Sequence, residues 1–545
     1  MLLLLVACTV ASSPIAPGDP SSDDPTTTSG RLPGTNPEEA DDADGVFATD
    51  RVAEIELTLP RAEWADIRDN PGAESWHTAD FRWNDEVVEN VAVRAFGQGS
   101  VVPGKPPLKI DFDRAVEGQD WHGLEQLKLD SSTQDAGFLN EVVGTWVLRQ
   151  SDLPAARTGF ARLTVNGDPA GFFVVLEPID DQFLQRWYGE DAGALYSIGT
   201  WRYAQGLNPI TWGTVLDWYE PQTSVGGDGA EILAAIEATA VGSDDDFLAK
   251  VDTETFTRIA VARASMGAID SFAADGNNFY LYDHLGQLTP IAWDLDADLG
   301  YPYYFDNALF MGLVEPWLWS HARANPVTGE VYDDPVHARM MARGWDVDGY
   351  LAKLLTGALE WEALDAQVAE WAATIEDAAC EDTYHSCTSF RHRVIDLRFF
   401  LHTRLSLLAG TEVATCEEAD PSGAVATVGT VLEDSSPLGP GLLVGGEHAC
   451  HGLFATPTAI VRLPVEEGNL ELRVGIHDAN LNSAPGARVS VVQGGSVLWS
   501  QEAVLAYDAP VAVSVPVEAG EVELRSQSLG GEVGGVVWAF PDPTR

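Results

Sequence analysis

Asp275-Gly-Asn-Asn278-Phe-Tyr-Leu-Tyr-Asp283 and the following Ile291-Ala-Trp-Asp294-Leu-Asp296-Ala-Asp298-Leu-Gly300 decide how this chain is organised. β-Branched and aromatic residues flank a turn-forming cluster, His284-Leu-Gly-Gln287, and this pattern predicts a hairpin of two short strands. Each predicted strand carries acidic or amide side chains at one end. An Asp with an Asn three residues on, and an Asp-x-Asp about twenty residues later, are what a magnesium–nucleotide site needs.

The chemistry of such a site divides among these residues. One carboxylate accepts the proton of an attacking hydroxyl, and an amide and a second carboxylate hold the metal that neutralises the phosphates. Acidic turns are also common between strands of no special function. The second stretch resembles half of a calcium loop, although Gly300 stands one place late and Phe305 replaces the bidentate glutamate. A nucleotide site, a structural calcium site and a plain acidic hairpin all remain open at this point.

The charge of the chain limits its partners. The 545 residues are enough for two or three domains, and their formal net charge of -53 would repel a nucleic-acid backbone. Lysine occurs at only five positions, Lys105, Lys109, Lys128, Lys250 and Lys353. A bound nucleotide would therefore need cations placed locally. This composition suits an extracellular or salt-exposed protein, and a genomic composition bias would look the same.

The first residues predict export. Residues 1–8 form an apolar run ending in Leu-Val-Ala-Cys8, which looks like a bacterial lipobox with Cys8 as the lipidated residue. Residues 9–45 are rich in Ser, Thr, Pro, Asp and Gly, and this composition predicts a disordered acidic tether. We therefore expect a protein of the cell envelope or the extracellular surface that meets the membrane only through a lipid anchor.

The other cysteines agree with export. Four remain if Cys8 is lipidated, and an even number in an exported chain suggests disulfide bonds. Proximity favours Cys380–Cys387 and Cys416–Cys450. A zinc site is disfavoured because the spacings do not match paired C-x-x-C ligands.

Local patterns divide the rest of the chain into three parts. Residues 46–185 read as strands around one amphipathic helix, Gly137 to Gln150, and residues 228–410 read as mostly helical, with a surface insertion expected from Ile198 to Gln222. Residues 411–545 contain short alternating segments separated by Gly, Pro and Asn turns, which predict an all-β sandwich or jelly roll. The fold class expected is therefore α+β. Such an appended β domain often binds a polysaccharide or a protein, and a purely structural cap is about as probable from the sequence.

A glycine-containing turn lies between two of the predicted strands. Gly97-Gln-Gly99-Ser100 is followed by Lys105, and backbone N–H groups in such a turn could cover phosphates. A turn of this kind is more often only a hairpin connection.

In their order along the chain, these pieces resemble the CotH family of bacterial spore-coat and secreted proteins. The resemblance runs from about Ile55 to Leu408. It rests on the glycine turn, the stretch from Lys105 to Phe112, Leu127-Lys-Leu-Asp130 with Asp135, the segment Glu177-Pro-Ile-Asp180, and the acidic hairpin. The family implies an atypical two-lobed protein-kinase-like fold, with a small lobe at about 46–185 and a large lobe at about 186–410. It also implies ATP-dependent phosphorylation of protein Ser or Thr outside the cytoplasm.

The resemblance implies roles for individual residues. Asp275 would be the catalytic carboxylate, Asn278 and Asp294 metal ligands, and Asp296 their support, with Mg²⁺ or Mn²⁺ as the metal. Lys109 is the first choice for the phosphate lysine, Lys105 the second, and Lys128 a third because its setting looks like an exposed strand position. Glu141 would pair with that lysine, Gly99 and Ser100 would cover phosphates, and the neighbourhood of Glu177 would meet the adenine.

The sequence departs from the family pattern near Phe138, where an arginine often found after the aspartate of the helix start is missing, and at two other places. Ala95-Phe96 interrupts the usual glycine turn, and Pro106-Pro107 interrupts a basic pair. These departures bear on phosphate binding more than on metal binding. The alternative function is a catalytically silent kinase-like surface lipoprotein with a structural divalent ion, acting as a scaffold or as a carbohydrate- or envelope-binding module.

Overall fold

The computed structural model describes residues 42–97, 101–198, 214–223, 225, 227–268, 271–272, 277–296, 298–299, 322–324, 331–333, 336, 339 and 347–409, and, in the C-terminal region, 422–433, 435–436, 439–440, 442–444, 447–449, 451–456, 458–476, 486–504, 510–529 and 535–540. Several sequence predictions concern residues outside these ranges: Cys8, Gly99, Ser100, Asp275 and the pair Cys416–Cys450. No helix of the described ranges is long and apolar enough to cross a membrane.

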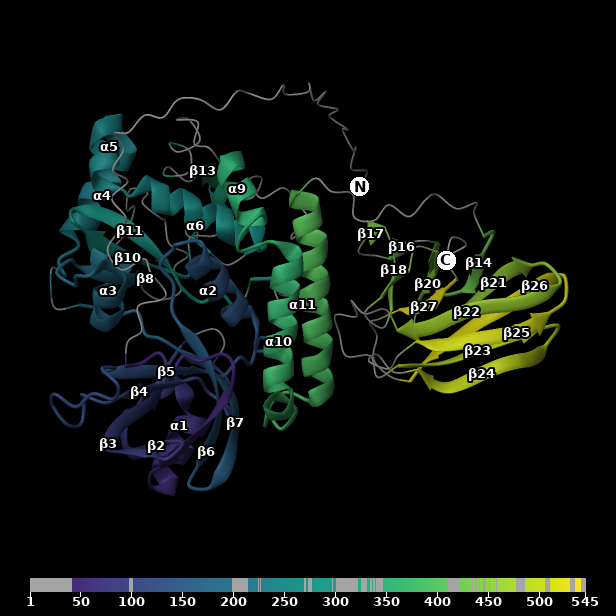
Figure 1. Cartoon of the computed structure of the whole chain (residues 1–545), viewed down its shortest axis with the longest axis horizontal. Coiled ribbons are helices and arrows are strands. Elements are labelled where there is room, and N and C mark those ends of the chain that lie inside the picture. The colour runs from purple at the N-terminus through teal and green to yellow at the C-terminus, as the bar shows by residue number, and fades with distance from the viewer. Residues whose placement is uncertain are drawn as a thin grey trace.

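The N-terminal strands close into a barrel (Figure 1). Its strands are β1 (Val52–Thr58), β2 (His77–Trp83), β3 (Glu86–Ala95), β4 (Leu108–Asp111), β5 (Gln126–Asp130), β6 (Thr158–Val165) and β7 (Asp168–Leu176). They are ordered β1-β2-β3-β4-β5-β7-β6, and β1 closes the barrel by pairing in parallel with β6. Alternate side chains of these strands fill the interior, as period-two patterning requires.

Four short helical elements accompany the barrel strands. They are α1 (Arg61–Asp69), the 3-10 turn η1 (Pro71–Ala73), α2 (Asn140–Gln150) and α3 (Asp181–Tyr188). Helix α2 is nearly enclosed, because Val142, Val143 and Val147 pack into a core shared with β6, β7 and the long C-terminal helices. The helix predicted at 137–150 therefore forms, and it joins the barrel to the helices that follow in the chain.

A second sheet carries the acidic hairpin. Its order is β11-β10-β8-β9, and antiparallel β10 and β11 form the predicted hairpin with the turn between His284 and Gln287. The strands are β8 (Leu195–Ile198), β9 (Tyr219–Pro221), β10 (Phe279–His284) and β11 (Gln287–Ala292). Since β11 ends at Ala292, Asp294 and Asp296 follow the strand instead of lying within it.

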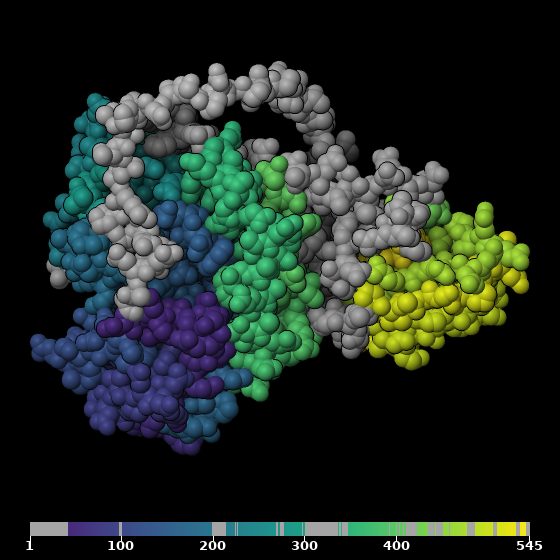
Figure 2. Space-filling model, viewed as in Figure 1, coloured from purple at the N-terminus to yellow at the C-terminus, as the bar shows by residue number. Residues whose placement is uncertain are grey.

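Helical elements fill much of the rest of this region, and those within residues 215–265 contact the sheet (Figure 1). The elements are η2 (Val215–Asp217), α4 (Ala230–Val241), α5 (Asp244–Lys250), α6 (Thr253–Ser265), α9 (Val347–Leu355), α10 (Trp361–Cys380) and α11 (Cys387–Leu408), with the small strand pair β12 (Ala322–Ala324) and β13 (Val331–Asp333). Figure 2 shows the green surface of α10 and α11 meeting the purple and blue surface of the barrel. Helices are present in the described part of residues 228–410, where the sequence predicts them.

The connection between α10 and α11 is a junction with the barrel. A disulfide joins Cys380 to Cys387, as predicted, and closes the loop that contains Asp382. The Asp382 carboxylate lies 2.7 Å from the Lys105 ammonium, and both side chains are almost fully buried. It also accepts a hydrogen bond from the Phe172 N–H of β7. We name residues 380–387 the junction loop.

A close approach of backbones makes this junction possible. Gly171, in β7, has φ +128°, and a Cβ there would lie 2.8 Å from both Asp382 Oδ1 and Lys105 Cε. A residue with a side chain is therefore excluded by space as well as by backbone conformation. His385 of the same loop makes a 2.8 Å hydrogen bond to the Ser132 carbonyl, which precedes α2.

The C-terminal region consists of two five-stranded sheets that share one core. One sheet has the order β14-β21-β26-β23-β24 and the other β15-β20-β27-β22-β25. The strands are β14 (Val425–Val428), β15 (Val431–Glu433), β20 (Gly452–Ala455), β21 (Ala459–Val465), β22 (Gly468–Ile476), β23 (Ala487–Gln493), β24 (Ser496–Val504), β25 (Val511–Val517), β26 (Gly520–Ser528) and β27 (Val536–Ala539), with the short pairs β16 (Ser435–Ser436) and β17 (Gly439–Pro440), and β18 (Leu442–Val444) and β19 (Glu447–Ala449). The mixed α+β fold with a β-rich C-terminal region is therefore confirmed.

The junction predicts a large loss of stability when Asp382 is removed. We expect Asp382→Ala to lower the free energy of unfolding by about 3–5 kcal/mol, because the Lys105 ammonium would be left buried without its carboxylate. Chemical denaturation with the disulfide intact measures this loss. Glu381→Ala is the matched control, since Glu381 pairs with Arg162 at 3.2 Å in the same loop but is largely exposed, and it should cost under about 1 kcal/mol. Equal losses in the two variants would contradict a buried junction.

Candidate functional site

The end of the acidic hairpin packs directly on α2. Gly144 of that helix allows the approach, because a Cβ there would lie 2.6 Å from Leu295 Cδ2. The Leu295 N–H donates to Glu141 Oε2, so the helix carboxylate holds the residue that follows Asp294. Glu141 Oε1 is buried without a hydrogen-bond partner. The Lys109–Glu141 ion pair expected from the sequence is not present in the part of the chain that the structure describes.

Arg263 of α6 ties the two sides of the hairpin together. Its guanidinium binds Asp298 with both arms, Nε to Oδ2 at 3.0 Å and Nη2 to Oδ1 at 2.8 Å, and both side chains are almost fully buried. It also donates to the backbone carbonyls of Asn278, Trp293 and Asp294, at 3.1, 3.2 and 3.3 Å. The two segments that the sequence identified as metal-binding are therefore connected through one side chain.

A second arginine contacts the aspartate at the start of α2. Asp135 accepts the backbone N–H groups of Leu139 and Asn140 at the start of α2, and Arg393 of α11 lies 3.3 Å from its other oxygen. The Asn140 amide then donates to the carbonyl of Asp296 at 2.7 Å. The sequence marked Asp135 through the family resemblance and as a residue that could cap this helix, and it gave no role to Arg393 or Asn140.

The carboxyl groups near the hairpin disfavour one another's ionisation. Burial, together with Asp294 and Asp130, raises the pKa of Glu141 well above its ordinary value. Burial and the same two neighbours raise the pKa of Asp296 well above its ordinary value. Asp294 itself is exposed. This group, which we name the acidic cluster, consists of Asp130, Glu141, Asp294 and Asp296.

Cations line up on the adjoining strands of the barrel. Arg94 of β3, Lys109 of β4 and Lys128 of β5 are direct cross-strand neighbours, so their side chains share one face of the sheet. Neither lysine has a carboxylate at ion-pair distance among the residues that the structure covers. We name these three residues the cationic row.

Lys128 is the member of the row nearest the acidic hairpin. Its ammonium lies 4.0 Å from the centre of the Trp293 ring and 5.6 Å from that of Phe96, directly before the glycine turn. Burial and the neighbouring Lys109 lower its pKa to about 7, against an opposing effect of Asp180 and Asp294. The sequence expected an exposed strand position here, but the aromatic rings on two sides enclose the amine. The pKa of Lys109 is also lowered, by burial and by Arg94.

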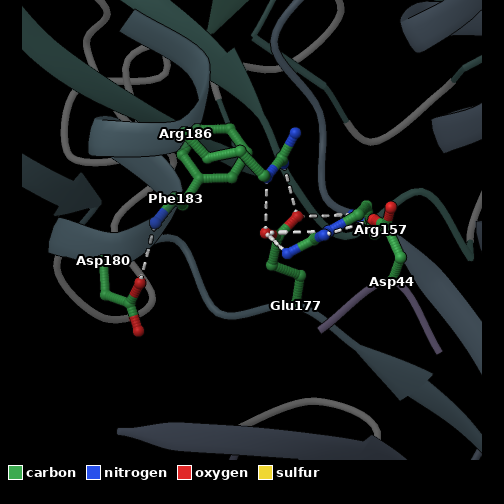
Figure 3. Close-up of polar contacts among 6 residues, drawn as sticks. All are labelled: Asp44, Arg157, Glu177, Asp180, Phe183 and Arg186. Carbon is green, nitrogen blue, oxygen red and sulfur yellow. Dashed lines mark hydrogen bonds and ion pairs between the residues drawn. The ribbon is translucent and has the colours of Figure 1, made fainter. Parts of the chain in front are cut away.

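Lys105 and Glu177 have other contacts than those expected. Lys105 is committed to Asp382 and lies over the Phe138 and Phe173 rings, which argues against the phosphate role suggested by the sequence. The Glu177 carboxylate binds two guanidinium groups, with Arg157 Nη2 2.8 Å from Oε1 and Arg186 Nη2 2.6 Å from Oε2 (Figure 3). Its carboxylate therefore has no free oxygen to offer an adenine, although the backbone after β7 remains beside the cationic row.

The segment after Glu177 turns into α3. Asp180 accepts the Phe183 N–H at 3.2 Å and so caps that helix, and Figure 3 shows it turned away from the Glu177 cluster. Burial raises the pKa of Asp180 to about 7. Asp180 also acts on the charge of Lys128 and Lys109, which places the start of α3 near the row.

The oxygen ligands present suit a magnesium or manganese ion that arrives with phosphates. Within the described ranges, no three His, Cys, Asp or Glu side chains form a ready-made metal cage. Magnesium does not require such a cage, since proteins commonly bind it through one or two carboxylates plus substrate phosphates. The exposed Asp294 and the unpartnered Glu141 Oε1 fit this chemistry.

The Glu177 cluster predicts a defined dependence of stability on pH. The two guanidinium groups lower the pKa of Glu177 to about 2, so its stabilising contribution is present above pH 4.5 and is lost as the pH falls toward 2. We expect Glu177→Gln to lower the free energy of unfolding by about 3 kcal/mol at pH 7, with a difference from wild type that shrinks between pH 4.5 and 3. Denaturation curves at several pH values measure this. A difference that stays constant over that range would contradict the assignment.

Comparison with known proteins supports one assignment. Solved structures that match include CBM51 from Clostridium perfringens GH95 in complex with methyl-galactose (15% identity, 22% of this chain and 92% of that chain, TM-score 0.20) and the M60 catalytic domain with CBM51-1 and CBM51-2 from Clostridium perfringens ZmpB (22% identity, 22% and 14%, TM-score 0.20). These TM-scores are too low to assign a shared fold. The comparison with curated proteins found no match.

The family model described as CotH kinase protein matches residues 93–407, which is more than half of the chain. The chain therefore belongs to the CotH kinase protein family, as its acidic hairpin and glycine turn predicted.

Proposed function

We propose that this protein is a tethered, exported kinase that transfers the γ-phosphate of ATP to Ser or Thr of surface or secreted proteins. The observation that carries the proposal is the grouping of charges around Trp293, with carboxylates on one side of this residue and cations on the other. On one side burial and like charge raise the pKa values of Glu141 and Asp296, and on the other burial and like charge lower those of Lys128 and Lys109. A magnesium nucleotide would relieve both conflicts at once, because its metal takes carboxylates and its phosphates take cations.

Lys128 is the residue we assign to the nucleotide phosphates, with Lys109 beside it. Strand β5 directly precedes α2, and it pairs with β7, from which the chain leaves the barrel at Glu177. A kinase needs its phosphate-binding lysine on such a strand. The strand lies between the helix that carries the glutamate, here Glu141 of α2, and the segment that meets the adenine, here the one at Glu177. In a protein of net charge -53, these unpaired amines are the local cations that a nucleotide requires.

The metal and the proton are assigned to the acidic hairpin. Asn278 and Asp294 would hold the divalent ion, with Asp296 in support, and the ion would supply neutralisation of the phosphate charge. Asp275 would accept the proton of the acceptor hydroxyl while the oxygen of that hydroxyl bonds to the γ-phosphorus. The bond from that phosphorus to the bridging oxygen breaks, and ADP leaves. In this proposal the barrel with α2 is the small lobe and the helical region is the large lobe.

We propose that the reaction takes place outside the cytoplasm, because we infer that the chain is exported. The disulfide between Cys380 and Cys387 supports an oxidising compartment. We propose that Cys8 carries a lipid anchor and that residues 9–45 tether the kinase domain to the membrane surface. We further propose that the two-sheet C-terminal region binds a polysaccharide or protein of the envelope.

Transfer of labelled γ-phosphate tests the proposal directly. Residues 46–545 are incubated with labelled ATP and Mg²⁺ or Mn²⁺, alone and with a Ser-rich acceptor, beside Asp275→Ala and Asp294→Ala. We expect label on wild type and a loss of at least about 100-fold in both variants, because each removes a group needed in the transition state. If wild type transfers no phosphate and ATP with metal causes no thermal stabilisation, the silent scaffold becomes the better description.

Lys128→Met separates function from stability. The folded pKa of about 7 lies below the ordinary 10.5, so the protonated amine costs stability fully below pH 7 and not at all above 10.5. We therefore expect Lys128→Met to raise the melting temperature at pH 7 while lowering kcat/KM at least about 100-fold through lost phosphate contacts.

Lys109→Met is the matched control, because Lys109 is its cross-strand neighbour but lies one strand farther from the hairpin. We expect it to lower kcat/KM less than Lys128→Met does. Scanning calorimetry and steady-state kinetics on the same samples measure both quantities. A larger kinetic loss in Lys109→Met would return the phosphate role to the first choice made from the sequence.

A further inference from the structure

We propose that Arg263 is a positioning residue of the phosphotransfer site, fixing the backbone of both metal-binding segments so that Asn278 and Asp294 present their side chains together. This inference rests on the proposed function. No sequence motif marks Arg263, which belongs to α6 and lies well before the hairpin in the chain.

The contacts of Arg263 are divided between the two segments. Its carbonyl partner on the first segment is Asn278, and its partners on the second are Trp293 and Asp294. The same guanidinium is oriented by the carboxylate of Asp298, which is fully buried. A planar group with a fixed fork of donors can make all these contacts at once, whereas a lysine ammonium cannot.

The backbone at both proposed ligands needs such support. Asn278 has φ 57° and Asp294 has φ 56°, and both lie in the left-handed region, which Asn and Asp enter more readily than other residues with a side chain. Such conformations are held in place by the surrounding structure. Arg263 contacts the carbonyl oxygen of each of these two residues, so it fixes the peptide units that set the direction of both side chains.

A direct link already joins the two segments. The Trp293 N–H donates to the Asn278 carbonyl at 3.2 Å, so that carbonyl accepts from both the opposite segment and Arg263. Removing the guanidinium would leave this link in place and would remove the contact from Arg263 to the Asp294 carbonyl. The expected consequence is a misdirected metal site in a folded protein.

Metal affinity is the readout that separates positioning from general stability. Mn²⁺ binding is measured by titration calorimetry in the presence of a non-hydrolysable ATP analogue, for wild type and Arg263→Lys. We expect the Mn²⁺ dissociation constant to rise about 10- to 100-fold, the range found for residues that orient metal ligands. The Mg²⁺ concentration that half-saturates phosphotransfer should rise in parallel.

Arg404→Lys is the matched control. Arg404 of α11 is as buried as Arg263 and also donates to backbone carbonyls of α6, those of Ala264 and Ser265, but none of its described contacts reaches the hairpin. We expect its Mn²⁺ dissociation constant to stay within about twofold of wild type, even where its melting temperature falls as far as that of Arg263→Lys.

Asp298→Asn is a second variant that tests the same role if Arg263→Lys does not fold. It keeps the size of the side chain and the guanidinium, but it loses the charge that orients Arg263, so the Mn²⁺ affinity should fall in the same direction and by less. If wild type binds no Mn²⁺ with nucleotide, the proposed function fails, and the positioning role falls with it. If wild type binds and the folded Arg263 and Asp298 variants bind equally well, the positioning role alone is overturned.

Discussion

Scarcity of positive charge is the constraint on which this structure depends. Most buried cations are used to hold carboxylates at the junctions between elements: Lys105 holds Asp382, Arg157 and Arg186 hold Glu177, Arg263 holds Asp298, and Arg393 holds Asp135. The attraction within such a buried pair repays its desolvation cost only when the geometry is good and further hydrogen bonds satisfy the remaining lone pairs. The two lysines of the cationic row stand out because their described surroundings provide no such carboxylate.

The fold could be predicted from the sequence wherever its pattern is local. The hairpin and α2 were predicted within a few residues, since alternation and helical periodicity are visible in neighbouring side chains. Strand β26 is the central strand of its sheet, yet its local pattern is weak, because Glu521, Glu523 and Arg525 alternate with only two large apolar residues. Closure of the barrel by the parallel pairing of β1 with β6 joins distant segments, and no local pattern reports it.

The candidate site was predictable by residue type and less so by partner. The acidic residues of the hairpin were identified because their spacing carries the chemistry. The sequence ranks Lys109 first, Lys105 second and Lys128 third, but strand position alone does not reveal which amine faces Trp293 and which enters a buried ion pair. Arg263 and Arg393 gave no signal, since each lies on a helix outside the motifs and its contacts with the hairpin segments are tertiary.

The junction loop has a consequence for how the protein opens. The Asp382 carboxylate accepts N–H groups from Phe172 on the barrel and from Tyr384 and His385 on its own loop, while the disulfide limits how far that loop can move. Among these three bonds, the one from Phe172 crosses from β7 to the loop, so the Phe172 amide loses it when the loop separates from β7. The hydrogen-exchange rate of that amide therefore reports how often the barrel and the helices part.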